Sequence, residues 1–182
     1  MSEPLWMRPF RAALGVLAVA ALIVAFTRND DGTVNYLSKF TYQSNAIGAV
    51  VLLGGALLPG RVLASPGWER LRGAAVMYLV TTFAVYGALI GGFDNPLTTD
   101  RHWTHTVLHQ LVPVAAVLDV AARPLRLRPG WGTIAVWMLY PLAFLAYSLV
   151  RGAATGWYPY AFLDPGASGG YGGGAVYVLG IA

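Results

Sequence analysis

The 182-residue sequence contains no cysteine, and only 11% of its residues are charged. The absence of thiols excludes disulfide bonds, thiolate metal sites and cysteine nucleophiles. The scarcity of charge says more, because an ordinary soluble domain carries about 25% charged residues. Hydrophobic residues make up 57% of the chain, and a soluble chain this short has too little interior to bury them. The composition therefore favours a protein that is surrounded by lipid.

The net charge of +4 comes from short basic clusters that lie between apolar runs. This arrangement is typical of membrane topology rather than of a nucleic-acid surface. A cytoplasmic N-terminus puts Arg8, Arg11, Arg61, Arg70, Arg72, Arg123, Arg126 and Arg128 inside, and leaves Arg28, Lys39, Arg101 and Arg151 outside with Asp30, Asp31, Asp94, Asp100 and Asp164. The sequence thus predicts a multi-pass protein of the cell membrane with its N-terminus in the cytoplasm. Its partner is the lipid bilayer, and the oligomeric state stays open.

Five apolar segments are long enough to cross a bilayer, which takes about 20 residues. They are residues 12–27, 42–58, 73–92, 106–122 and 131–150. A sixth apolar run, residues 172–182, covers only about half of the hydrocarbon core at about 1.5 Å per residue. We therefore expect a single integral membrane domain over residues 1–182, an all-α bundle of five spans with a partial sixth. The first segment is expected to be a retained anchor rather than a cleaved signal peptide.

Polar side chains gather at the outer ends of two spans. The second span opens with Thr41, Gln43, Ser44 and Asn45, and such residues are costly in lipid unless they face the bundle interior and find partners there. All three histidines of the chain lie within eight residues around the start of the fourth span. The predicted topology places both groups on the same side of the membrane. A hydroxyl and an imidazole are therefore expected near one another.

Three hypotheses follow from the histidines, which are His102, His105 and His109. The first is a threonine nucleophile with a histidine base, which requires the two groups to lie about 3 to 5 Å apart. The second is a metal or haem site, which lacks a facing histidine on another helix. The third is a purely structural role in the membrane interface. In the same span, Asp119 is expected to pair with Arg123, four residues later.

The chain resembles bacterial members of the androgen-induced-gene family of multi-span membrane proteins, which includes membrane-embedded threonine hydrolases. Three motifs carry the resemblance over most of the chain. They are Phe40-Thr41-Tyr42 with the polar residues after it, His109 through Pro113, and Trp157-Tyr158-Pro159 with Phe162-Leu163-Asp164. The eukaryotic members differ, because their second histidine follows three residues after the first and their histidine-to-proline spacing is one residue longer.

The resemblance implies that Thr41 is the nucleophile and His109 the catalytic histidine of a lipid ester hydrolase without cofactor or metal. Because of the altered spacing, His105 is kept as an alternate base. Ser44 and Asn45 share a helical face with Thr41, so they are candidate hydrogen-bond donors to the oxyanion. The alternative function is non-enzymatic: a sensor, scaffold or transporter subunit that uses the same outer pocket to bind a ligand or partner.

Overall fold

Helices supply all the regular secondary structure in residues 4–92, 102–170 and 172–173, the part of the chain that the computed structural model describes. The long elements are α1 (Met7–Thr27), α3 (Phe40–Leu57), α5 (Pro66–Val85), α7 (Val112–Ala122) and α8 (Trp131–Thr155). The short ones are α2 (Thr33–Leu37), α4 (Gly60–Leu63), η1 (Tyr86–Ile90), α6 (Trp103–Thr106), η2 (Val107–Leu111), η3 (Ala161–Leu163) and α9 (Pro165–Ser168). The predicted all-α class is confirmed for these residues.

Four continuous helices are long and apolar enough to cross a membrane. They are Met7–Thr27, Pro66–Ile90, Trp103–Ala122 and Trp131–Thr155. The remaining long helix, α3, begins with two polar turns and is not among the four. The predicted count of five spans is therefore not confirmed. The expected sixth span, residues 172–182, lies almost entirely outside the described residues.

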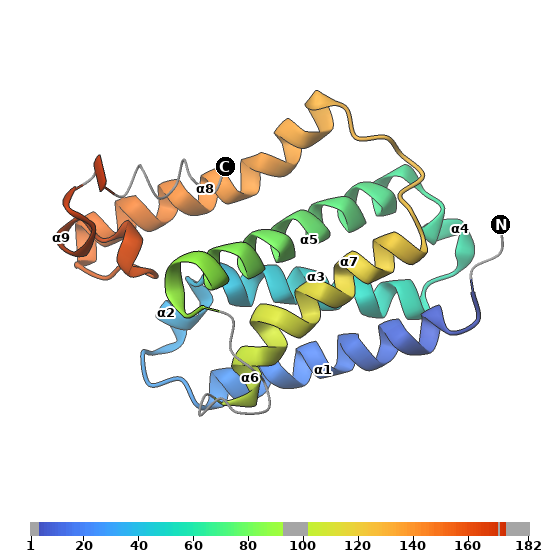
Figure 1. Ribbon diagram of the computed structural model, residues 1–182, viewed down its shortest axis with the longest axis horizontal. Helices are drawn as coiled ribbons and strands as arrows, with labels where there is room; N and C mark the ends of the chain where they lie inside the picture. The colour runs from blue at the N-terminus through green and yellow to red at the C-terminus, as the bar shows by residue number, and fades with distance from the viewer. Residues whose placement is uncertain (1–3, 93–101, 171, 174–182) are drawn as a thin grey trace.

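The helices α1, α3, α5 and α7 pack against one another around a common core. In Figure 1, α1, α3 and α5 lie side by side, α7 crosses them, and α8 leans away beyond α5. Ala18 and Ala21 of α1 are fully buried in this core, and such small side chains let helices approach closely. In contrast, α8 joins the bundle through aromatic contacts, in which Trp137 packs near Tyr78.

Two prolines, Pro113 and Pro141, lie in the middle of long helices, and the structure satisfies a carbonyl near each of them. A proline has no N–H, so the carbonyl four residues earlier loses its usual partner. For Pro141 in α8 this carbonyl belongs to Trp137, and the Tyr78 hydroxyl donates to it at 3.0 Å. Pro113 follows the π-helical segment η2, which is described with the site below. Near each proline, a side chain of a neighbouring helix thus donates a hydrogen bond to a backbone carbonyl.

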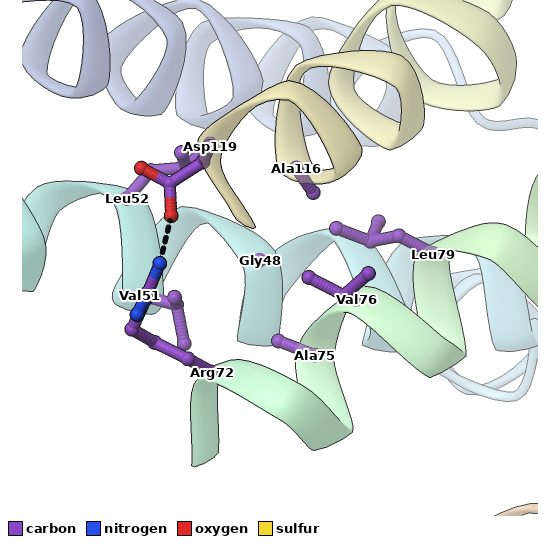
Figure 2. Close-up of a pocket in the computed structure, with 9 residues that line it drawn as sticks. All are labelled: Gly48, Val51, Leu52, Arg72, Ala75, Val76, Leu79, Ala116 and Asp119. Atoms are coloured by element: carbon purple, nitrogen blue, oxygen red, sulfur yellow. Dashed lines mark hydrogen bonds and ion pairs between the residues drawn. The ribbon is translucent and has the colours of Figure 1, made fainter. Parts of the chain in front are cut away.

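Four buried charged side chains and the partly exposed Arg123 lie together where α1 and α5 begin and α7 ends. Asp119 forms ion pairs with Arg11 and with Arg72, the latter at 2.9 Å, and Glu69 pairs with Arg72 and Arg123 at 3.3 Å. Figure 2 shows Arg72 reaching toward Asp119 between α5 and α7. The prediction that Asp119 pairs with Arg123 is wrong. Because α7 ends at Ala122, Arg123 leaves the helical path and turns toward Glu69 instead.

Candidate functional site

Thr41 and His109 meet inside the bundle. Thr41 lies in the first turn of α3, His109 lies in η2, and their side chains are buried, with exposed fractions of 6% and 9%. The Thr41 hydroxyl oxygen is 3.4 Å from His109 Nε2. Sixty-eight residues separate them in the chain, so the helix packing alone creates this pair. The distance falls within the range that the threonine–histidine hypothesis requires.

The hydrogen bonds of His109 determine its tautomer and so which ring nitrogen presents a lone pair to Thr41. Its Nδ1 lies 3.0 Å from the carbonyl oxygen of His105. A carbonyl oxygen can only accept a hydrogen bond, so in the neutral ring Nδ1 carries the proton. Nε2 is then an acceptor directed at the Thr41 hydroxyl. The ring of Tyr86 stacks on the imidazole at 4.0 Å and holds its plane.

The π-helical turn that carries His109 leaves one backbone carbonyl without a partner in its own helix. The N–H of Val112 bonds to the carbonyl of Val107, five residues earlier. The Leu108 carbonyl would accept the Val112 N–H in a regular α-helix, so here it loses that hydrogen bond. The next residue along the helix, Pro113, has no N–H to replace it. The amide nitrogen of Asn45 donates to this carbonyl at 2.9 Å. The widened turn is thus stabilised from α3.

Asn45 also connects the π-helical turn to the backbone of α3 at Thr41. Its Nδ2 donates to the Thr41 carbonyl at 2.8 Å as well as to Leu108. Because both partners are carbonyls, the nitrogen rather than the oxygen of the amide faces them. One fully buried side chain therefore connects the backbone of the nucleophile candidate to the backbone beside the base candidate.

The other residues singled out in the sequence lie around this pair with different contacts. Ser44 is fully buried and bonds to the Thr82 hydroxyl at 2.8 Å and the Thr41 carbonyl at 3.1 Å. The donors of Ser44 and Asn45 thus serve backbone and side-chain partners within the bundle. The His105 ring is exposed and stacks on His109 at 5.5 Å. Among the three histidines, it is His109 that the helices bring to Thr41.

An apolar cavity of about 390 Å³ opens beside Thr41, between α5 and α8. Its polar lining residues are Thr41, Thr81, Thr82 and Tyr160. The rest of the lining is Phe40, Met77, Val85, Ile90, Ile134, Met138, Pro141, Leu142, Phe144, Leu145, Phe162 and Leu163. A cavity of this size, mostly apolar with a few polar groups, is typical of a small-molecule site. Its chemistry suits a hydrocarbon chain whose polar end lies at Thr41.

Tyr160 completes the site, and the sequence did not indicate it. Its hydroxyl oxygen lies 3.4 Å from the Thr41 hydroxyl and 3.3 Å from the Thr41 backbone nitrogen. The ring packs against Phe162, with centroids 5.3 Å apart, and near Phe144 of α8. Burial raises the pKa of the phenol, so it keeps its proton. Tyr160 lies between two motifs of the segment after α8, but tyrosines beside a predicted span are commonly interface anchors.

In residues 4–92, 102–170 and 172–173, no group of three or more His, Asp or Glu side chains is arranged to hold a metal ion. The geometry instead provides a hydroxyl and a phenol in the wall of an apolar cavity, with an imidazole nitrogen 3.4 Å from the hydroxyl. Comparison with known proteins adds no identity to this arrangement, because no family model, no curated protein and no solved structure matches the chain.

Proposed function

We propose that the protein is a membrane-embedded hydrolase of lipid esters, in which Thr41 is the nucleophile and His109 the general base. The contact between the Thr41 hydroxyl and the unprotonated Nε2 of His109, at 3.4 Å, carries the proposal. A threonine hydroxyl is a weak nucleophile until an adjacent base can take its proton. The resemblance to the androgen-induced-gene family assigns the same roles to these two residues.

The proposed reaction has two steps. The Thr41 oxygen attacks the acyl carbon while its proton moves to His109 Nε2, and the tetrahedral intermediate expels the alcohol, which takes that proton. This leaves an acyl ester on Thr41. A water molecule then attacks the acyl carbon and gives a proton to His109. The fatty acid leaves, and Thr41 recovers its proton from the imidazole, so His109 acts as base and then as acid in each step.

The cavity supports a lipid as the substrate. Its lining is apolar apart from a few hydroxyl-bearing residues, and Thr41 lies in its wall. An acyl chain in this cavity, between α5 and α8, brings its ester carbonyl to Thr41 at the polar end. Burial of the chain contributes roughly 0.8 kcal/mol per CH₂ group relative to water. That contribution favours long-chain over short-chain esters in detergent solution.

We further propose that α3 is a span, which gives five spans with a partial sixth and an N-terminus in the cytoplasm. The polar first turns of α3 are compatible with a membrane because Ser44 and Asn45 are fully buried and hydrogen-bonded inside the bundle. Polar side chains at membrane depth are tolerated in that situation. With this topology, Thr41 and His109 lie near the outer leaflet.

The test is turnover of p-nitrophenyl decanoate by detergent-purified protein. Thr41→Val keeps the shape of the side chain and should abolish turnover, and His109→Gln should lower it by about 10²–10⁴-fold, the contribution of a general base. Thr81→Val is the matched control, because Thr81 lines the same cavity but its hydroxyl bonds to the Met77 carbonyl of its own helix. Folded wild-type protein without turnover, or Thr41→Val with normal turnover, would refute the proposal and favour a non-enzymatic binding protein.

A further inference from the structure

Tyr160 binds the start of α3. The residue before this helix, Lys39, makes no side-chain capping bond, so the first N–H groups of α3 need partners from elsewhere. The Thr41 N–H donates to the phenol oxygen of Tyr160 at 3.3 Å. The phenol oxygen therefore accepts a bond from the backbone, and its own O–H remains available to donate.

The hydrogen bonds that link Tyr160, Thr41 and His109 then all donate in the same direction. The His105 carbonyl accepts from His109 Nδ1, and His109 Nε2 accepts from the Thr41 hydroxyl. Because the Thr41 hydroxyl uses its one donor in the hydrogen bond to His109, its oxygen accepts from the nearby Tyr160 hydroxyl, 3.4 Å away. The same direction of donation holds along the whole series. It places a hydrogen-bond donor next to the oxygen that attacks the substrate.

Tyr160 and His109 approach Thr41 from different surroundings. Tyr160 lines the apolar cavity together with Thr41, and His109 is not among the lining residues. The phenol is therefore on the side where a substrate carbonyl binds, and the imidazole lies behind the nucleophile. The side-chain donors of Ser44 and Asn45 are occupied by Thr82 and by backbone carbonyls.

We propose that the Tyr160 hydroxyl donates the hydrogen bond that stabilises the oxyanion formed when Thr41 attacks an ester carbonyl. This inference rests on the proposed hydrolase function and deepens it. As the bond from the Thr41 oxygen to the acyl carbon forms, the carbonyl electron pair moves onto the carbonyl oxygen. The Tyr160 hydroxyl turns from the Thr41 oxygen to that oxyanion and keeps its proton. When the intermediate collapses, the electron pair returns and the alcohol leaves with the proton from His109.

The competing explanation is that Tyr160 only holds the end of α3 in place. Both explanations predict slower turnover in Tyr160→Phe, so a second substrate is needed to separate them. In a thionoester the carbonyl oxygen is replaced by sulfur, which is a weak hydrogen-bond acceptor. A donor to the oxyanion therefore accelerates the oxoester far more than the thionoester. A residue that only positions Thr41 affects both substrates equally.

The experiment compares kcat/KM for p-nitrophenyl decanoate and its thionoester in wild type, Tyr160→Phe and Tyr140→Phe. Tyr140→Phe is the matched control, because it removes a 2.6 Å hydrogen bond to Gln43 on the same helix without touching Thr41. We expect Tyr160→Phe to lose about 10²–10³-fold on the oxoester, the effect of losing one oxyanion donor. Its loss on the thionoester should be much smaller, so the ratio of kcat/KM on the oxoester to kcat/KM on the thionoester should fall. Tyr140→Phe should leave the ratio unchanged.

The outcomes separate this inference from the proposed function. Equal losses on both substrates, or no loss at all, overturn the role of Tyr160 while Thr41-dependent turnover in wild type still supports the hydrolase. Wild-type protein without turnover overturns both. If Tyr160→Phe fails to fold, fluorinated tyrosines at position 160 keep the ring and hydroxyl. The oxoester-to-thionoester ratio of kcat/KM should rise as fluorination makes the phenol a stronger donor. A ratio that does not depend on fluorination contradicts the proposal.

Discussion

Replacing Asn45 by alanine should destabilise the bundle more than the loss of an ordinary interhelical hydrogen bond. The side chain is fully buried, and its amide nitrogen donates to the carbonyls of Thr41 and Leu108. Hydrogen bonds between membrane helices contribute only about 0.6 kcal/mol on average, because the separated groups find other partners. The question is whether the Leu108 carbonyl has such a partner.

The structure indicates that it does not. The Val112 N–H is engaged by the Val107 carbonyl, and Pro113 has no N–H to offer. Without Asn45, the Leu108 carbonyl becomes a buried acceptor with no donor, which costs about 1–3 kcal/mol. We therefore expect Asn45→Ala to lower the free energy of unfolding by that larger amount.

The assay is unfolding in mixed micelles by SDS titration, followed by tryptophan fluorescence. Ser44→Ala is the matched control, because it also removes a buried hydrogen bond from α3, and Thr82 keeps its bond to the Tyr78 carbonyl afterwards. It should cost only about 0.6 kcal/mol. Equal effects of Asn45→Ala and Ser44→Ala would show that the Leu108 carbonyl finds another donor, and would refute the reasoning.

Further changes test other parts of the structure. Asp119→Ala leaves Arg11 and Arg72 buried without their shared carboxylate, so the SDS titration should show a loss of about 3–5 kcal/mol; a change below 1 kcal/mol contradicts this. In Gly152→Ala the added Cβ would lie 2.0 Å from the Tyr158 ring, so this ring or the loop that carries it must move, which should cost about 1–3 kcal/mol and reduce ester turnover.

The helices and the approach of Thr41 to His109 follow from simple features of the sequence. Long apolar runs predict the long helices, and the expected alternation across a membrane predicts that the second and fourth apolar segments begin on the same side. Whether the second segment is itself a span was not decided, because its polar turns make it less apolar than the other four helices. The sequence indicated which groups share an end of the bundle, and only packing showed which of them touch.

The remaining contacts depend on tertiary detail that residue spacing does not carry. Asp119 and Arg123 are four apart, but the helix ends between them, so the expected pair does not form. The π-helical turn could be suspected from Pro113, yet its stabilisation by Asn45 depends on how α3 packs against it. Tyr160 is 119 residues from Thr41, and nothing in its local sequence distinguishes it from the tyrosines that anchor membrane interfaces.

Covalent labelling tests most directly whether His109 activates the Thr41 hydroxyl. Detergent-purified protein would be treated with an alkyl fluorophosphonate, digested, and analysed by tandem mass spectrometry. We expect one adduct on Thr41 in the wild type, and little or none in His109→Gln that has the same unfolding midpoint. An adduct on another side chain, or equal labelling of Thr41 in both proteins, would contradict activation of Thr41 by His109.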